Sequence, residues 1–350
     1  MRTSRLLLLG LAAVSVAAAE MPAAHATFPG TNGRIAWSRD GDIFTMRSDG
    51  SGKRRLTDSP RNFEWAEWSP DGETLAVIRN PVERRPRIVL MDRAGLEVTP
   101  LARARYTVQH MAWSPDCTRI AYCDLDLSDP DAEAPYPAAI KVVEVATGTQ
   151  SRLTEFEDKT CSPSWSPDGT QLAFDAGDST DTDIYIMNAD GTNQIVLTTD
   201  SDTRQFSPEW SPSGDVIAFV RPIPAPGNQG DQAAVIETIG VDGTGLTTLT
   251  EPVDAFDGGI QWSPDGTHLA FYRLQITAPY ETHLGVVAAD GSGDALLSTM
   301  EISPMEWSPD STIIAFSREG NIFTINADGT EETKIAGHRA RDVFPSWQAR

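Results

Sequence analysis

Regularly spaced tryptophans constrain the fold of this chain more than any other feature. Intervals of 45, 52, 45, 52, 45 and 40 residues separate seven of them: Trp68, Trp113, Trp165, Trp210, Trp262, Trp307 and Trp347. Ser-Pro-Asp-Gly follows three of these tryptophans, at 69–72, 166–169 and 263–266, and close variants follow three more. Self-similarity at such a period is typical of folds in which one small unit is repeated. The chain is therefore predicted to be an array of similar units.

Each unit contains four short runs with β-strand character. After the tryptophan run come a second run such as Leu172–Phe174, a third such as Ile184–Met187, and a fourth such as Thr248–Thr250. Pro and Gly occupy the turns between them, and Asp-Gly pairs such as Asp190-Gly191 are strong hairpin signals. No stretch shows sustained helical periodicity. Four strands at a period near 45 residues predict the blade of an all-β protein, the β-propeller.

The two ends of the chain predict how the propeller closes. The first unit begins at Arg34–Trp37, which has the pattern of a second strand, and its missing first strand appears at Phe344–Trp347. We therefore expect seven blades of four antiparallel strands, in a ring closed by the C-terminal strand completing blade 1. A single propeller domain would then occupy residues 27–350.

The N-terminal residues have the layout of a secretory signal peptide. Arg2 and Arg5 precede an apolar run from Leu6 to Ala19, and Ala24–Ala26 is a small-residue cleavage motif. We expect residues 1–26 to be removed and the protein to be exported, as a periplasmic or secreted protein. An uncleaved N-terminal anchor is the alternative, and no transmembrane segment is expected after cleavage because no other apolar run has membrane length.

The charge of the chain excludes one large class of partner. It carries 50 Asp plus Glu against 28 Lys plus Arg, a formal charge of −22 at pH 7. A nucleic-acid binder needs a basic face to neutralise phosphates, so nucleic acid is not an expected partner. Loose docking on an anionic membrane is disfavoured for the same reason.

The repeat resembles a known family. The runs Pro163–Phe174 and Asp183–Gly191 look like the TolB-type propeller repeat, and the resemblance covers residues 32–348. It implies an exported protein that binds other proteins or ligands. TolB proteins carry an α/β domain before the propeller, which we do not expect here because Ala26 and Asn32 lie too close together.

Catalytic signatures are sparse, so we expect no catalytic residues, cofactor or metal. The sequence has no G-x-S-x-G, H-E-x-x-H or paired C-x-x-C motif. His110, His283 and His338 are predicted near one face of the propeller, where a related family of oligogalacturonate lyases holds a metal with a histidine cluster. The three residues belong to well-separated blades, which favours the interpretation that they are ordinary surface histidines. Acidic loops such as 124–133 could hold calcium, but a solvated loop is the favoured interpretation.

Three cysteines are present: Cys117, Cys123 and Cys161. Cys117 occupies the glycine position of a turn, and Cys123 ends the following strand on the opposite face. A five-residue strand spans about 16 Å, too far for a disulfide between them. Cys161 is predicted on the same face as Cys123 in the adjacent blade, so the sequence predicts the pair Cys123–Cys161.

These observations favour a non-enzymatic binding scaffold. Its expected partner is another exported or envelope protein, or a small or saccharide ligand at the channel mouth. A metal-assisted carbohydrate lyase or hydrolase is the alternative.

Charged residues five or six positions before a tryptophan are the candidate ligand contacts: Arg204, Asp257, Arg341 and Asp342. They are predicted where the inner strands open at the mouth bordered by the long loops. The competing interpretation is that they pair with each other across blades and join the ring.

Overall fold

The computed structural model describes residues 28–350 apart from positions 59–62, 81–84, 106, 126–136, 156–160, 178–180, 200–203, 226–231, 252, 278–279, 301–304 and 339–340. Within this part of the chain every regular element is a β-strand. None of its segments forms a helix that could cross a membrane. The proposed signal peptide, 1–26, lies outside the described residues.

Antiparallel sheets of four strands account for most of the fold. The first sheet combines the two ends of the chain, in the order β28 (Asp342–Ala349), β1 (Asn32–Arg39), β2 (Asp42–Arg47) and β3 (Arg54–Arg55). The next two sheets are β4 (Phe63–Trp68), β5 (Thr74–Arg79), β6 (Arg87–Asp92) and β7 (Glu97–Arg103), then β8 (Thr107–Trp113), β9 (Arg119–Leu125), β10 (Ala138–Glu144) and β11 (Gln150–Arg152).

Two further four-stranded sheets follow the same order. One contains β12 (Cys161–Trp165), β13 (Gln171–Gly177), β14 (Thr182–Asn188) and β15 (Ile195–Val196). The other contains β24 (Glu306–Trp307), β25 (Ile313–Arg318), β26 (Asn321–Asn326) and β27 (Thr333–Gly337).

One larger sheet lies between these two in the chain. It joins β16 (Phe206–Trp210), β17 (Val216–Pro224), β18 (Gln232–Gly240) and β19 (Thr247–Thr248) to β20 (Ala255–Trp262), β21 (His268–Gln275), β22 (Thr282–Ala288) and β23 (Ala295–Thr299). The two halves meet through one parallel pairing, Ala234 with Phe256.

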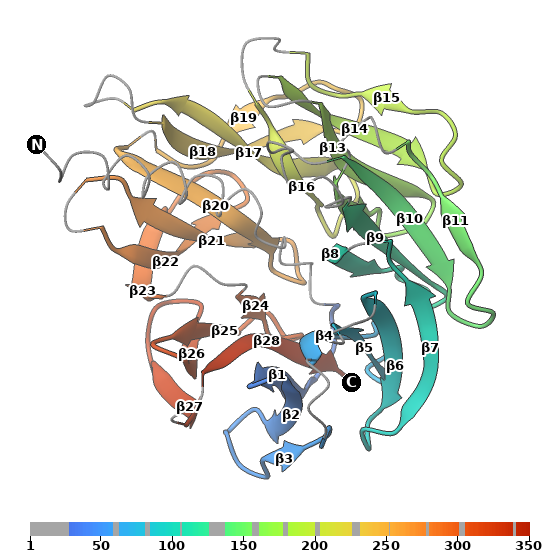
Figure 1. Ribbon diagram of the computed structural model, residues 1–350. Helices are drawn as coiled ribbons and strands as arrows, with labels where there is room; N and C mark the ends of the chain where they lie inside the picture. The colour runs from blue at the N-terminus through green and yellow to red at the C-terminus, as the bar shows by residue number, and fades with distance from the viewer. Residues whose placement is uncertain are drawn as a thin grey trace, which may run out of the picture.

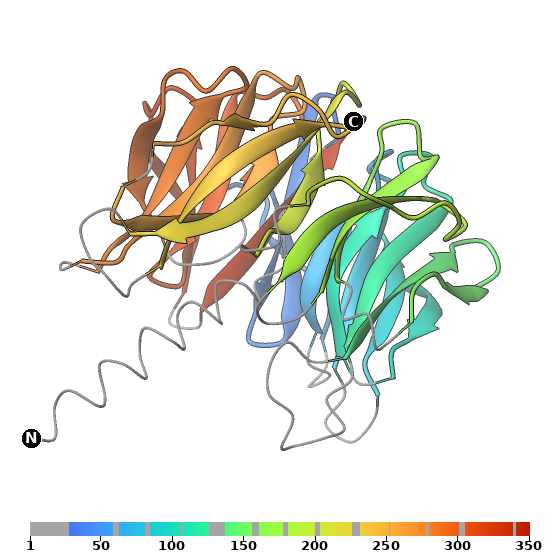
Figure 2. The same ribbon diagram turned by 90° about the horizontal axis from the view of Figure 1, so that it is seen from above.

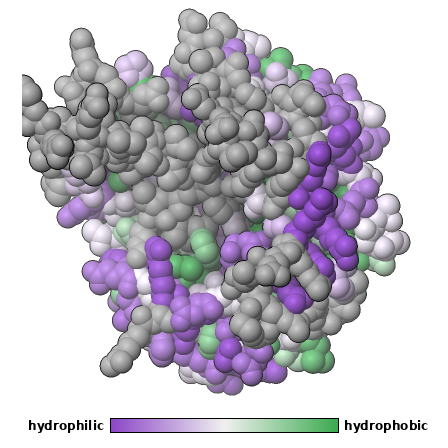
Figure 3. Space-filling model, in the orientation of Figure 1, coloured by the Kyte–Doolittle hydropathy of each residue, from purple (hydrophilic) through white to green (hydrophobic). Residues whose placement is uncertain are grey.

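Figure 1 shows the sheets arranged about a common centre, with β4, β8, β24 and β28 near the centre and β3, β7, β11 and β27 at the rim. Figure 2 shows the strands running between two opposite faces of the molecule. The outer strands β3, β11 and β19 are exposed along their length. Accordingly, hydrophilic residues dominate much of the described rim in Figure 3.

The Ser-Pro-Asp-Gly turns share one hydrogen-bond network, which explains why the motif recurs. In the turn after Trp68, Ser69 Oγ donates to Asp71 Oδ1 at 2.6 Å and accepts from Thr74 N at 3.0 Å, while Gly72 N donates to Ser69 O. Gly72 adopts a φ of 65°, which a residue with a Cβ adopts only with strain. We call the face that carries these turns the turn end, and the opposite face the loop end.

In four of the units the fourth run ends in a threonine for a structural reason. Thr57, Thr154, Thr198 and Thr250 are buried, and each Oγ1 accepts a hydrogen bond from the backbone N–H of an isoleucine on the third strand. This bond fixes the outer strand to its neighbour where the short strand pairing ends.

Candidate functional site

A one-residue bulge in the inner strands determines which side chains meet at the loop end. Pairing with the second strand shifts by one residue in the strand pairs β28/β1, β4/β5, β8/β9, β12/β13, β16/β17 and β20/β21. Positive φ values occur three positions before the tryptophan at His110, Ser162, Ser207, Gly259 and Phe344. A bulge changes the residues that face each other beyond it.

Because of this bulge, two of the predicted contact residues face arginines. Asp257 is completely buried and receives hydrogen bonds from Arg273 Nε and Nη2, both at 2.7 Å. Asp342 is equally buried and receives two hydrogen bonds from Arg39, the Nη2 bond at 2.7 Å. Each pair lies within one sheet, between an inner strand and its second strand, and neither joins two sheets.

The two predicted arginines have different surroundings. Arg204 lies just before β16, makes a bridge with Thr182, and places its guanidinium 5.8 Å from the ring centre of Phe206. Arg341 is exposed and lies beside Gly320, at the turn between β25 and β26. The four predicted residues therefore lie at the starts of three inner strands in separate parts of the fold, and they do not form one cluster of mutual ion pairs.

Two tight turns lie on either side of β28 at this end. The β1–β2 turn consists of Asp40 and Gly41, and the β25–β26 turn of Glu319 and Gly320, all four with positive φ. Gly41 O accepts from Phe63 N and Gly320 O accepts from Asp342 N, both at 2.9 Å. Each turn thus anchors the inner strand of the next sheet, and Arg341 lies at such an anchor.

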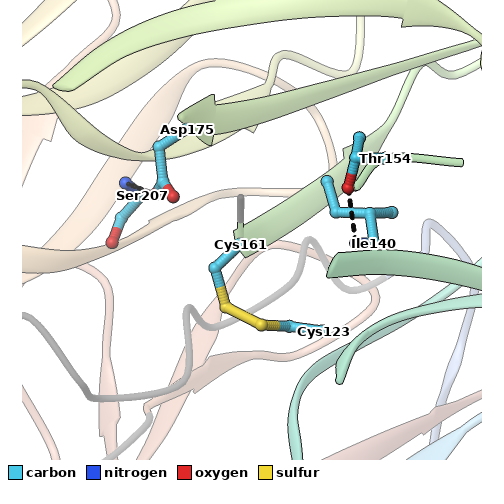
Figure 4. Close-up of a disulfide and its surroundings, with 6 residues drawn as sticks. All are labelled: Cys123, Ile140, Thr154, Cys161, Asp175 and Ser207. Carbon is cyan, nitrogen blue, oxygen red and sulfur yellow. Dashed lines mark hydrogen bonds between the residues drawn. A yellow bond between two sulfur atoms is a disulfide. The ribbon is translucent and has the colours of Figure 1, made fainter. Parts of the chain in front are cut away.

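Cys123 on β9 and Cys161 on β12 form a disulfide with a Cα–Cα distance of 5.2 Å, shown in Figure 4. The bond joins two neighbouring sheets at the loop end. Nearby, Ser207 N donates to Asp175 Oδ2 at 2.9 Å, and burial raises the pKa of the Asp175 carboxyl. Cys117 is a free, partly exposed thiol at the turn end with a φ of 60°, as expected for its glycine position.

The three histidines do not assemble into a site. His110 is buried on β8, His283 lies on β22 with Nε2 3.6 Å from Glu281, and His338 is exposed after β27. Among the described residues, no three potential metal-ligating side chains converge. The acidic loop at 126–133 lies outside the described residues.

The residue before each tryptophan forms a second set of positions at the turn end, which the sequence analysis did not single out. Its side chain accepts a hydrogen bond from the backbone N–H of the next sheet's tryptophan in four cases: Ser346 to Trp68, Ser164 to Trp210, Glu209 to Trp262 and Gln261 to Trp307. The backbone N–H of Trp113 bonds in the same way to the Glu67 carboxylate. At the equivalent position Ala112 offers no side-chain acceptor.

A pocket of about 270 Å³ opens beside these positions. Its walls are mostly indole and pyrrolidine rings, and Glu67 is the one ionisable side chain among them. The lining residues are Phe28, Pro29, Glu67, Ala112, Trp113, Pro115, Ser164, Trp165, Pro167, Trp210, Pro212 and Pro264. Burial raises the pKa of Glu67 well above its usual range, and the nearby Glu306 raises it further. A pocket with apolar walls and one buried carboxyl has the form of a ligand site.

The repeat, the strand order and the turn network all agree with one family model. The TolB beta propeller domain matches residues 77–349. The chain belongs to this family. An uncharacterized protein of Agrobacterium fabrum is 27% identical over 211 residues, which cover 59% of this chain and 68% of that protein.

Solved structures extend the likeness to propellers of other functions. TolB from Acinetobacter baumannii superposes with a TM-score of 0.56 at 18% identity, covering 91% of this chain and 67% of that one. An oligogalacturonate lyase from Vibrio parahaemolyticus gives a TM-score of 0.64 at 13% identity, covering 85% and 87%. Similarity at these identities shows a common fold and nothing about activity.

Proposed function

We propose that this TolB-family protein is an exported, non-enzymatic propeller that binds a protein or ligand of the cell envelope or the secreted fraction. We further propose that it has seven blades in a closed ring. The single parallel pairing of Ala234 with Phe256 supports treating the eight-stranded sheet as two blades. Pairing of β28 with β1 supports closure by the C-terminal strand.

Export is supported by two independent features. The N-terminal sequence has the pattern of a signal peptide over residues 1–26. A disulfide between Cys123 and Cys161 suits an oxidising compartment such as the periplasm or the extracellular space.

The observation that carries the binding role is the state of the charged groups at the loop end. Asp257 and Asp342 are each held by two hydrogen bonds from a neighbouring arginine, so these carboxylates stabilise the fold and are poorly placed to transfer protons. Arg341 is exposed next to one of these pairs. A rigid scaffold presenting an exposed arginine suits recognition of an exported partner or a saccharide.

The test is a cross-linking pull-down with the purified protein from the native envelope or culture fluid. Arg341→Ala should reduce the captured partner and leave the melting temperature nearly unchanged, because this side chain is exposed. Arg54→Ala, on the exposed outer strand β3, is the matched control and should capture the partner normally. Equal capture by both variants would remove Arg341 from the binding surface.

Asp342→Ala should behave differently from Arg341→Ala. It leaves the Arg39 side chain, which is 16% exposed, without its buried carboxylate partner, at a cost of up to about 3 kcal/mol. A lowered melting temperature for this variant would therefore report on the fold and not on partner binding.

A further inference from the structure

The pocket at the turn end exists because the side chains before the tryptophans differ in size around the centre. Ala112 and Ser164 are small and follow Glu67 in consecutive sheets, which leaves space in front of Trp113, Trp165 and Trp210. At Glu209 and Gln261 the same position holds longer side chains that bond to the next tryptophan. The space is therefore specific to one side of the centre.

Glu67 has one carboxyl oxygen without a hydrogen-bond partner. The carboxylate accepts the backbone N–H of Trp113, whereas Oε2 has no hydrogen-bond partner and is shielded from solvent. Buried carboxylate oxygens are normally paired, because an unpaired one loses its hydration without compensation. A donor in the pocket would pair with this oxygen once the Glu67 side chain turns it toward the pocket.

We propose that this pocket binds a primary alkylammonium group. Its N–H donates to the Glu67 carboxyl after the glutamate side chain turns Oε2 toward the pocket, and its alkyl chain lies against the tryptophan and proline rings. An anion is disfavoured because Glu67 lies close enough to Glu306 for the two carboxyl groups to repel. A divalent cation would lack ligands, since no three suitable side chains converge in the described chain. This site lies at the face opposite Arg341, so it is independent of the proposed partner surface.

Binding should be coupled to the release of a proton. Burial and the Glu306 charge raise the pKa of Glu67, so in the empty pocket this carboxyl keeps its proton to a higher pH than a solvated glutamate does. An ammonium group favours the ionised form. Affinity should therefore fall as the pH is lowered below the raised pKa, by about tenfold per unit at the limit.

The test is calorimetric titration of the purified protein with n-pentylammonium chloride, repeated in buffers of different ionisation enthalpy. We expect saturable binding below about 10 mM and a net proton release. Glu67→Gln should weaken binding by at least about tenfold and abolish the proton release. Glu73→Gln, an exposed neighbour at the same face, is the matched control and should bind as the unmodified protein does.

Two further probes make the result decisive. Pentyltrimethylammonium carries the charge without an N–H donor, and 1-pentanol has the alkyl chain without a charge; both should bind at least about tenfold more weakly. Ala112→Leu should fill the pocket and abolish binding. Equal binding of pentanol, or unchanged binding by Glu67→Gln, would overturn the proposal, as would no saturable heat with the unmodified protein.

Discussion

The two halves of the eight-stranded sheet and the two sheets bridged by the disulfide are joined by different means. Between β16–β19 and β20–β23 there is a continuous apolar core, a backbone pairing of Ala234 with Phe256, and stacking of Phe206 on Phe256 at 6.2 Å. Between β8–β11 and β12–β15 the apolar clusters are smaller, and a covalent bond joins Cys123 to Cys161. The comparison indicates that a disulfide joins sheets where packing and hydrogen bonding contribute less.

Glycines allow close packing inside one of the two halves, β20–β23. Gly258 and Gly259 on β20 lie directly beneath the Tyr272 ring, where an added Cβ would approach ring atoms to 2.6–2.9 Å. The aromatic ring of β21 can therefore lie flat over the inner strand. Trp262 completes the interface, because its N–H groups bond to Glu209 Oε1 and Glu209 O.

The largest expected effect is on the interface between β16–β19 and β20–β23, which we call the packed interface. Trp262→Ala removes a side chain that is only 2% exposed, which leaves a cavity and breaks the bond from Nε1 to Glu209 O. The substitution should lower the free energy of unfolding by about 3–5 kcal/mol. Trp165 lies at the interface between β8–β11 and β12–β15, which the disulfide bridges and which we call the bridged interface. Trp165→Ala should lower the free energy of unfolding by less, because its apolar cluster is smaller and the disulfide remains. Urea denaturation of both variants measures the difference. A larger loss for Trp165→Ala would reverse the comparison.

The next effect is on the bridged interface. Replacing Cys123 and Cys161 together by Ala should lower the free energy of unfolding by about 2–4 kcal/mol, because the bond closes a 38-residue separation. Cys117→Ala should leave stability nearly unchanged and serves as the control. Mass mapping without reductant should find Cys123 and Cys161 in one disulfide-linked peptide pair. Free thiols at both positions would contradict the structure.

The sequence was sufficient to predict the all-β repeat because turn residues and tryptophans occupy fixed positions in each unit. The Cys123–Cys161 pair could be inferred for the same reason, since the repeat places both residues at one face. Pairing of Asp342 with Arg39 was harder to infer. Counting from the pair Ile35–Trp347 without a bulge would place Val343 opposite Arg39, and the bulge at Phe344 brings Asp342 there instead.

The turn-end pocket was not predicted because its key position varies. Glu67, Ala112 and Ser164 share no chemical type, and only their place before a tryptophan relates them. The signal that could have revealed it is strand alternation: where the tryptophan packs against the preceding sheet, the residue before it faces the following sheet. A charged residue at that position then indicates a candidate binding site. That Glu67 Oε2 lacks a hydrogen-bond donor, however, depends on packing that no local pattern encodes.

The smallest expected effect tests why the bridged interface is weaker. Ala112 lies where Ser164 and Ser346 accept the next tryptophan's N–H, at 3.0 and 3.4 Å. Ala112→Ser should supply the equivalent acceptor for Trp165 and raise the free energy of unfolding by about 0.5–1 kcal/mol. Urea denaturation in the unmodified and the Cys123→Ala/Cys161→Ala backgrounds measures the gain, which should partly offset loss of the disulfide.

Ser164→Ala is the reciprocal control for that gain. It removes the acceptor for Trp210 N and should cost about 1 kcal/mol at a neighbouring interface that has no disulfide. If Ser164→Ala destabilises while Ala112→Ser has no effect in either background, the hydrogen bond matters but its absence does not explain the weaker interface. The smaller apolar clusters would then account for the difference, because the disulfide would be compensating for missing packing and not for a missing acceptor.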